Sequence, residues 1–263
     1  MATAVFFHAH PDDETITTGG TMAKMAAEGH RVVLVTATGG ELGEFPEGFL
    51  DPGEDLAQRR SRELESACAV LGVARRVSLG FHDSGMAGTP ANDAEGSFWR
   101  TDVDEAATAL AAILAEEAAE VLSIYDEHGG YGHPDHIQVH RVGVRAAELA
   151  ATPRLYMATI NRAHFLRLAA QAADFGVELP ESEVPELSEL GVEEERITTA
   201  VDVQAFLDAK RRAMEAHASQ IAETSFFLAV PPEAFAVMWG TEWYVRHGAE
   251  PGGAVETSLL GGS

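Results

Sequence analysis

Short apolar runs alternate with amphipathic segments over the first 160 residues of the chain. The runs at 3–7 and 31–38 are too short for helices and too apolar for surface segments, which is typical of strands buried on both faces. Similar patterns predict further strands over 75–81, 120–125 and 154–160, and helices over 14–29, 56–73, 103–119 and 134–150. This repeated alternation predicts an α/β fold, a doubly wound, Rossmann-like, mostly parallel sheet with helices on both faces. In the common strand order 3-2-1-4-5, the first and fourth strands are neighbours at the switch point.

The alternation weakens after residue 161. The patterns there predict a helix to about 175, a solvated acidic linker over 180–195, an edge strand over 196–203, a helix over 204–221, and an aromatic tail with Phe226, Phe227, Trp239, Trp243 and Tyr244. We expect residues 161–263 to be a helical and aromatic extension. It would continue the domain formed by residues 1–160, in which the candidate metal site described below lies, and it would complete a substrate pocket.

Composition narrows the class of protein. The 263 residues are 46% hydrophobic, as in an ordinary soluble globular chain. A formal charge of −24 disfavours nucleic acid and anionic membrane as partners, because both require a basic surface. The single cysteine, Cys68, excludes an intrachain disulfide and a thiolate zinc cluster. The absence of a charged signal region and of a long apolar stretch predicts a cytoplasmic protein. Homo-oligomerisation is left open.

Two clusters of ionisable residues each follow a predicted strand. The first is His8-Ala9-His10-Pro11-Asp12-Asp13-Glu14, and the second, over 126–136, ends in Gly132-His133-Pro134-Asp135-His136. In open α/β sheets ligands bind beyond the carboxyl ends of the strands. Ionisable groups gathered there need a counter-charge, most economically a metal ion. The sequence therefore predicts a metal site formed by both clusters.

His10, Asp13 and His136 are the candidate metal ligands. Imidazole and carboxylate suit Zn²⁺, and three protein ligands with an open fourth position are typical of catalytic zinc. Because consecutive residues cannot leave one turn in the same direction, Asp12 can face a water molecule as general base. His133 could protonate a leaving amine or stabilise an oxyanion, with Asp135 orienting it. The alternatives are a helix cap for His133 and a helix-dipole role for Asp135.

The other histidines have plainer interpretations, and other classes of protein stay open. His8 fits a buried, hydrogen-bonded strand residue, His140 either a support for His136 or a packing residue, and His217 a structural residue. The pair His8 and His10 resembles the His-x-His of two-metal amidohydrolases and phosphoesterases. A non-catalytic sugar- or nucleotide-binding module is a further alternative. No Gly-x-Gly-x-x-Gly follows either of the first two strands, which disfavours a dinucleotide site.

Together the two motifs resemble those of the PIG-L/LmbE-like zinc deacetylases of N-acetylated sugars. Weaker similarity extends over 36–44, 60–72, 83–86 and 210–220. The resemblance implies one zinc ion per chain, or another divalent metal, held by His10, Asp13 and His136. It implies hydrolysis of an N-acetyl or other N-acyl amide on a small glucosamine-type substrate.

The resemblance also implies roles for the remaining motif residues. Asp12 corresponds to the general base, and His133 to the residue that stabilises the oxyanion and protonates the amine, with Asp135 tuning it. Tyr131 matches a tyrosine near the substrate carbonyl in mycothiol-pathway members. Arg60 and Asp83 match positions that hold the sugar or its aglycone.

Overall fold

One mixed sheet organises the chain. The structure, a computed structural model, describes residues 1–171, 190–225 and 227–261, and within these its sheet has seven strands in the order β3-β2-β1-β4-β5-β7-β6. The strands are β1 (Thr3–His8), β2 (Arg31–Thr38), β3 (Arg75–Phe81), β4 (Val121–Tyr125), β5 (Arg154–Thr159), β6 (Thr199–Asp202) and β7 (Thr241–Arg246). β1 to β5 pair in parallel, so the predicted fold class and the order 3-2-1-4-5 are confirmed.

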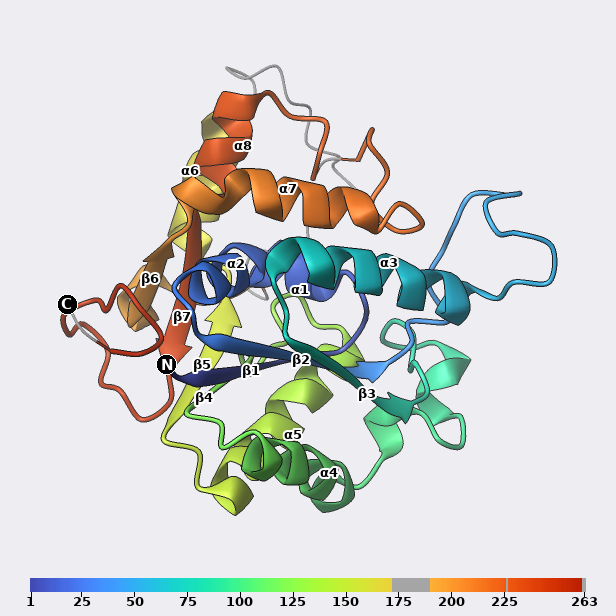
Figure 1. The fold of residues 1–263 in the computed structure, drawn as a ribbon, viewed down its shortest axis with the longest axis horizontal. Helices are drawn as coiled ribbons and strands as arrows, with labels where there is room; N and C mark the ends of the chain where they lie inside the picture. The colour runs from blue at the N-terminus through green and yellow to red at the C-terminus, as the bar shows by residue number, and fades with distance from the viewer. Residues whose placement is uncertain (172–189, 226, 262–263) are drawn as a thin grey trace.

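The helices form layers on both faces of this sheet. They are α1 (Asp13–Thr17), α2 (Gly19–Ala27), α3 (Leu56–Leu71), α4 (Val103–Glu116), α5 (Pro134–Ala150), α6 (Arg162–Gln171), α7 (Leu207–Ala216) and α8 (Pro232–Trp239). Figure 1 shows α4 and α5 on one face, α1 to α3 on the other, and α7 stacked outside α1 to α3. Alternate residues of β1 enter the two cores, Val5 and Phe7 on the α4/α5 side and Phe6 on the other. β1 therefore packs against a core on each face of the sheet, between β2 and β4.

The predicted helix over 14–29 is two helices. The break falls at Thr18, where φ is −135° and the hydroxyl contacts His8 Nε2 at 2.9 Å. The carboxylate of Glu242, from β7, accepts hydrogen bonds of 2.8 Å from the amides of Gly20 and Thr21 and so satisfies the start of α2. Lys210 Nζ, fully buried, lies 2.6 Å from Glu242 Oε1 and donates to the carbonyl of the α1 residue Ile16. A long-range ion pair thus stabilises a break that local spacing could not reveal.

The C-terminal part adds two strands antiparallel to each other. The predicted edge strand is confirmed as β6, whereas β7, which pairs antiparallel with β5, and α8 were not predicted. The predicted helix over 204–221 ends at Ala216. The prediction of a solvated linker is wrong for Leu190 and Val192, which are buried, and Gly191 N donates to Gly130 O at 2.9 Å. Residues 172–175, 180–189 and Phe226, which those predictions also covered, lie outside the described residues.

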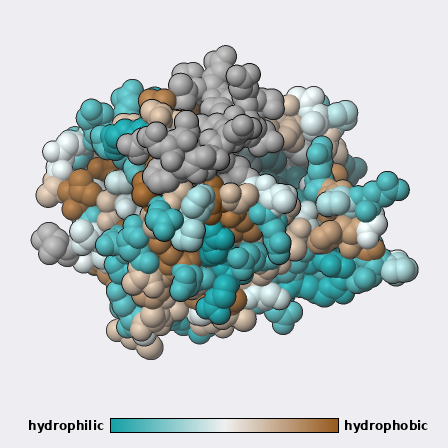
Figure 2. Space-filling model, turned by 90° about the horizontal axis from the view of Figure 1, so that it is seen from above, coloured by the Kyte–Doolittle hydropathy of each residue, from teal (hydrophilic) through white to brown (hydrophobic). Residues whose placement is uncertain are grey.

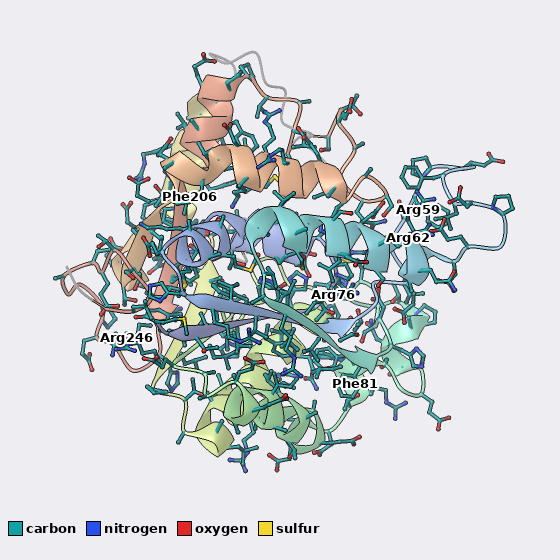
Figure 3. All side chains as sticks on the ribbon, viewed as in Figure 1. Arg59, Arg62, Arg76, Phe81, Phe206 and Arg246 are labelled. Carbon is teal, nitrogen blue, oxygen red and sulfur yellow. The ribbon has the colours of Figure 1, made fainter. Side chains whose placement is uncertain are left out.

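Acidic side chains anchor the loop before α3. Arg59 Nη2 lies 2.7 Å from Glu54 and 3.0 Å from Asp51, and Arg62 also pairs with Glu54. Figure 3 shows both arginines near the N-terminal end of α3, beside this loop. The face drawn in Figure 2 is largely hydrophilic, with hydrophobic residues in small separate groups. No helix within the described ranges is long and apolar enough to cross a membrane.

Candidate active site

The two predicted clusters meet beyond the carboxyl ends of β1 and β4. The ring of His10 lies 4.7 Å from that of His133 and 5.4 Å from that of His136, between centroids. All three histidines are buried. The parallel pairing of β1 with β4 brings the clusters together, because it places both strand ends at one edge of the sheet.

Asp13 lies between two of these histidines. Its Oδ2 is 3.3 Å from Nδ1 of His10, and its Oδ1 is 3.3 Å from Nε2 of His136. The backbone amide of His10 also donates to Oδ2 at 2.8 Å. The three predicted metal ligands therefore point toward one another.

The second ring nitrogen of each of these histidines has a partner outside the group. Asp135 Oδ2 lies 3.1 Å from His10 Nε2, and the carbonyl of Gly129 lies 3.1 Å from His136 Nδ1. Such partners commonly orient metal-bound imidazoles. His136 Nε2 is buried and has no hydrogen-bond partner among the described residues. An imidazole nitrogen with its lone pair turned toward a carboxylate suits a cation, so the residues present fit zinc.

The charges around His10 support the same conclusion. Burial opposes an imidazolium there, but hydrogen bonds to Asp13, Asp135 and Asp83 outweigh it and raise the pKa of His10 well above its usual value. Burial would raise the pKa of Asp13, yet His136 and His10 hold it well below the usual range. Several carboxylates around one imidazole leave an excess of negative charge, which favours a bound cation.

Two groups of ligand atoms other than the predicted set are compact. Nitrogens of His10, His133 and His136 lie within 4.8 Å of one another, as do ligand atoms of His10, Asp83 and Asp135. However, Asp83 and Asp135 approach the Nε2 of His10, the nitrogen that faces away from Asp13. His133 already uses Nδ1 to accept the amide of Asp135 at 3.1 Å. The set of His10, Asp13 and His136 is not one of these two groups, and it stays a prediction.

His133 is the N-terminal cap of α5, and the predicted contact with the carboxylate of Asp135 is wrong. That carboxylate instead contacts His10 and accepts the amide of Ser84 at 3.0 Å. Burial, reinforced by His10 and His136, lowers the pKa of His133 to about 4. Because Nδ1 accepts the Asp135 amide, the neutral ring carries its proton on Nε2. His133 is thus a neutral hydrogen-bond donor.

Asp12 has a strained backbone. Its φ of 105° is rare for a residue with a side chain and costs of order 1–3 kcal/mol. Its amide donates to Glu14 Oε2 at 2.9 Å, and Arg60 Nη2 lies 3.0 Å from its Oδ1. Burial raises the pKa of Asp12 to about 6, with Arg60 opposing this rise and Asp13 adding to it. A carboxylate with such a pKa is matched to accept a proton near neutral pH.

Arg60 is buried, and its donors are largely occupied. Its Nη atoms donate to the carbonyls of Gly40 and Pro11, to Asp12 and to Gln220. Gly40, at φ 64°, is required beside it, since a Cβ there would lie 2.4 Å from the guanidinium carbon. The geometry makes Arg60 a support for Asp12, and the predicted contact with substrate stays a prediction.

The remaining predicted residues lie close to this group. Asp83, also buried, places Oδ1 3.6 Å from His10 Nε2 and accepts the amides of Gly85 and Leu42. Tyr131 is 40% exposed, and its ring centroid lies 4.9 Å from that of His136. The predicted residues are therefore gathered in one region.

Sequence reasoning missed Tyr125. Its ring stacks on His136 with centroids 4.3 Å apart and planes 8° from parallel. Its hydroxyl contacts Nδ1 of His8 at 2.9 Å. The position of Tyr125 at the end of β4, directly before the second cluster, was an available signal.

His8, His140 and His217 contribute no ligand atom to this group. Both ring nitrogens of His8 contact hydroxyls, those of Tyr125 and Thr18, which disfavours the two-metal alternative that needs His8 as a ligand. His140 Nδ1 contacts the carbonyl of Tyr125 at 3.0 Å. His217 forms a buried pair with Glu14, with Nε2 to Oε1 at 2.7 Å.

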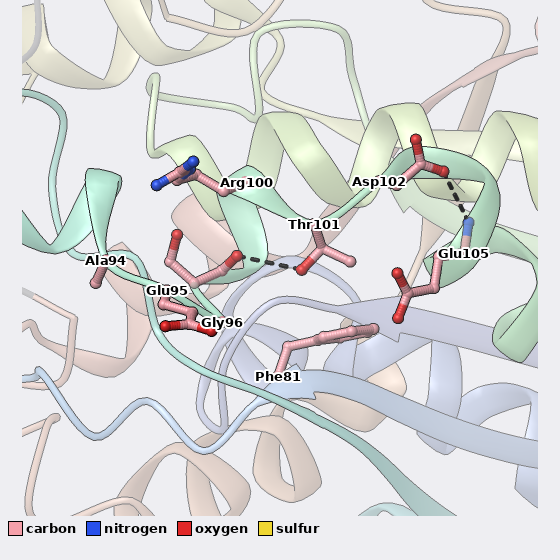
Figure 4. A pocket seen from close by; sticks show the side chains of 9 residues that line it. Phe81, Ala94, Glu95, Gly96, Arg100, Thr101, Asp102 and Glu105 are labelled. Carbon is pink, nitrogen blue, oxygen red and sulfur yellow. Dashed lines mark hydrogen bonds between the residues drawn. The ribbon is translucent and has the colours of Figure 1, made fainter.

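A separate cavity of about 580 Å³ lies between the end of β3 and the start of α4. Figure 4 shows its lining, which includes Phe81, Glu95, Arg100 and Asp102. None of the predicted site residues lines it. The histidine and aspartate group remains the candidate site.

The chain is similar to proteins of one family over most of its length. Residues 5–147 match the model of the PIG-L family, described as GlcNAc-PI de-N-acetylase. A relative from Thermomonospora curvata, named 1D-myo-inositol 2-acetamido-2-deoxy-alpha-D-glucopyranoside deacetylase, is 43% identical over 98% of this chain and 96% of its own. A relative of the same name from Acidothermus cellulolyticus is 45% identical over 94% of this chain and 89% of its own.

A solved structure shares the fold. The deacetylase of the teicoplanin biosynthesis pathway superposes with a TM-score of 0.62 at 18% identity, covering 95% of this chain and all of that one. At this identity the likeness concerns the fold alone. The family match and the curated relatives carry the assignment: this chain belongs to the PIG-L family of de-N-acetylases.

Proposed function

We propose that the protein is a zinc-dependent deacetylase that hydrolyses the N-acetyl amide of a glucosamine-type sugar. The curated relatives, named for deacetylation of an N-acetylglucosaminyl inositol, make that sugar the first substrate to test. The observation that carries the proposal is the arrangement of His10 and His136. Each ring has one nitrogen held by an outer partner and the other turned toward Asp13.

His10, Asp13 and His136 would hold one zinc ion. When bound, zinc would polarise the acetyl carbonyl and lower the pKa of water. The carboxylates around His10 support this by offsetting the added positive charge. Asp135 would act on the metal site through His10 and not through His133.

Asp12 would move the protons of the reaction. Its carboxylate would take a proton from the attacking water and pass it to the amide nitrogen as the C–N bond breaks, since an amine is a poor leaving group unless protonated. A pKa of about 6 supports both steps, because it makes the group a usable base and, once protonated, a usable acid.

His133 would donate a hydrogen bond from its Nε2–H group to the developing oxyanion. Its neutral form supports this role, as the amide of Asp135 holds Nδ1 in the accepting state. The half-exposed Tyr131 would supply a second donor from the rim. Residues 161–263 would complete the pocket, since Gln220 lies against Arg60.

The test combines zinc content with release of free amine from N-acetylglucosaminyl inositol and other N-acetylglucosaminides. Asp12→Asn should keep zinc and fold but lose about 10²–10⁴ in kcat, and His133→Ala should lose about 10² with zinc unchanged. Alanine at His10, Asp13 or His136 should remove zinc. Wild-type turnover in Asp12→Asn, or full zinc in all three ligand variants, would refute the proposal.

A further inference from the structure

Glu14, the last residue of the first motif, is fully buried and joins two distant parts of the chain. Its Oε2 accepts the backbone amide of Asp12 at 2.9 Å, and its Oε1 lies 2.7 Å from Nε2 of His217. His217 follows the end of α7 and is also fully buried. His217, 203 positions further along the chain, therefore contacts the Glu14 carboxylate, which in turn accepts the backbone amide of Asp12.

The backbone of Asp12 needs such support. A residue with a side chain leaves φ 105° unless surrounding contacts prevent it. Glu14 and Arg60 hold the peptide unit before Asp12, since the Glu14 carboxylate accepts its N–H and Arg60 donates to its carbonyl, that of Pro11. On the other side of Asp12, the amide and hydroxyl of Thr15 donate to its carbonyl. Arg60 also contacts the Asp12 side chain. Removing the Glu14 contact would allow the backbone to relax and would carry the carboxylate away from its position.

His217 is itself rigidly placed. Its amide donates to Met214 O at 3.0 Å, and the following turn is clamped to α3, where Glu63 accepts from the amide and hydroxyl of Ser219 at 3.0 and 2.6 Å. Figure 1 shows α7 lying across α1 and α3, the layer that carries Glu14 and Glu63. His217, which is held by contacts outside α1, therefore fixes the position of the Glu14 side chain.

We propose that Glu14 and His217 are a positioning pair that holds the strained backbone of Asp12 and so aims its carboxylate at the reacting water. The proposal rests on the function of Asp12 proposed above. Neither residue contacts the metal ligands through a side-chain hydrogen bond that the structure describes. Loss of the pair should therefore lower kcat and leave KM and zinc content unchanged.

Two substitutions of His217 separate positioning from general stability. Glutamine places its amide nitrogen near the position of Nε2, which contacts Glu14, whereas asparagine places it near that of Nδ1, which has no hydrogen-bond partner in the described part of the chain. His217→Asn should lose about 10²-fold in kcat, the effect of misplacing a catalytic group by about 1 Å. His217→Gln should retain most of the wild-type kcat. Both should keep KM and one zinc per chain.

Tyr244→Phe is the matched control. It removes a buried hydrogen bond of 2.8 Å to Thr21 that also joins the C-terminal part to the helices over β1, but has no link to Asp12. Its kcat should equal that of wild type even if its melting temperature falls. Equal losses in kcat for His217→Asn, His217→Gln and Tyr244→Phe would overturn the proposal, as would wild-type kcat in His217→Asn.

If His217→Asn does not fold, Glu14 provides a second pair. Glu14→Gln keeps an oxygen for the amide of Asp12, whereas Glu14→Met has a similar length and no acceptor. Retained kcat in the first and a loss of about 10²-fold in the second support the proposal, and equal kcat in the two overturns it. Failure of the proposed function is distinct, because Asp12→Asn would then turn over substrate normally.

Discussion

Gly129 provides a direct test of the metal site. Its carbonyl orients His136, and its φ of 66° requires glycine. A Cβ at this position would lie 2.6 Å from Cβ of His136 and 2.9 Å from the amide nitrogen of Ile137. Ordinary contact begins at 3.4 Å, so the loop or the start of α5 must move by roughly 0.8 Å.

Gly129→Ala should therefore weaken zinc binding. A movement of this size breaks the 3.1 Å contact between the Gly129 carbonyl and His136 Nδ1 and turns the ring away from Asp13. Loss of such an outer partner typically costs 10–100-fold in metal affinity, or about 1.4–2.7 kcal/mol. The measurement is the Kd for zinc by competition with a chromogenic chelator, together with the melting temperature of the metal-free protein.

Gly130→Ala is the matched control for backbone strain. Gly130 has a φ of 76°, yet a Cβ there meets nothing within 4 Å. Both substitutions place a side chain on a left-handed backbone and should lower the free energy of unfolding by about 1–2 kcal/mol. Both should therefore lower the melting temperature. Zinc affinity should fall in Gly129→Ala alone. Equal zinc Kd values for the two variants would refute the role assigned to the Gly129 carbonyl.

Two more predictions follow from the partners of His10 and Asp12. Asp135→Ala should raise the Kd for zinc by about 10–100-fold because it releases His10 Nε2, whereas His133→Ala should not; an unchanged Kd in Asp135→Ala would contradict the role of Asp135 at His10. Arg60 lowers the pKa of Asp12, so Arg60→Met should raise that pKa and move the acid limb of kcat/KM to higher pH by about 1 unit or more, with Arg60→Lys moving it less. An unchanged pH profile in Arg60→Met would contradict the effect of Arg60 on the pKa of Asp12.

Sequence periodicity predicted the parallel core well because burial on both faces leaves continuous apolar runs. It could not predict β7, because Thr241, Glu242 and Arg246 leave only a short apolar run in this strand, and Trp243 and Tyr244 were therefore interpreted as part of an aromatic tail. The break at Thr18 depends on Glu242, which lies 222 residues from Gly20. Interactions across such separations leave no local pattern.

In the candidate site, too, local sequence predicted some features and long-range contacts determined the others. The two motifs predicted which residues gather, since strand ends of a parallel sheet share one edge. They did not predict which atoms face one another. Asp135 lies two residues from His133, yet only its backbone reaches that ring, because the first turn of α5 directs the carboxylate toward His10. Side-chain direction at a helix start depends on the cap, and the cap depends on the fold.

The buried pair of Lys210 and Glu242 has a consequence for the order of assembly during synthesis. Lys210 holds the carbonyl of Ile16, and Glu242 satisfies the first amides of α2, so these N-terminal elements lack their partners until the ribosome has made residue 242. Domains generally fold as units while the N-terminus emerges first. The parallel strands can pair early, whereas the segment that follows the first motif must wait. Nascent chains arrested before residue 242 should therefore expose this segment to proteases, and released chains that contain residues 1–263 should protect it.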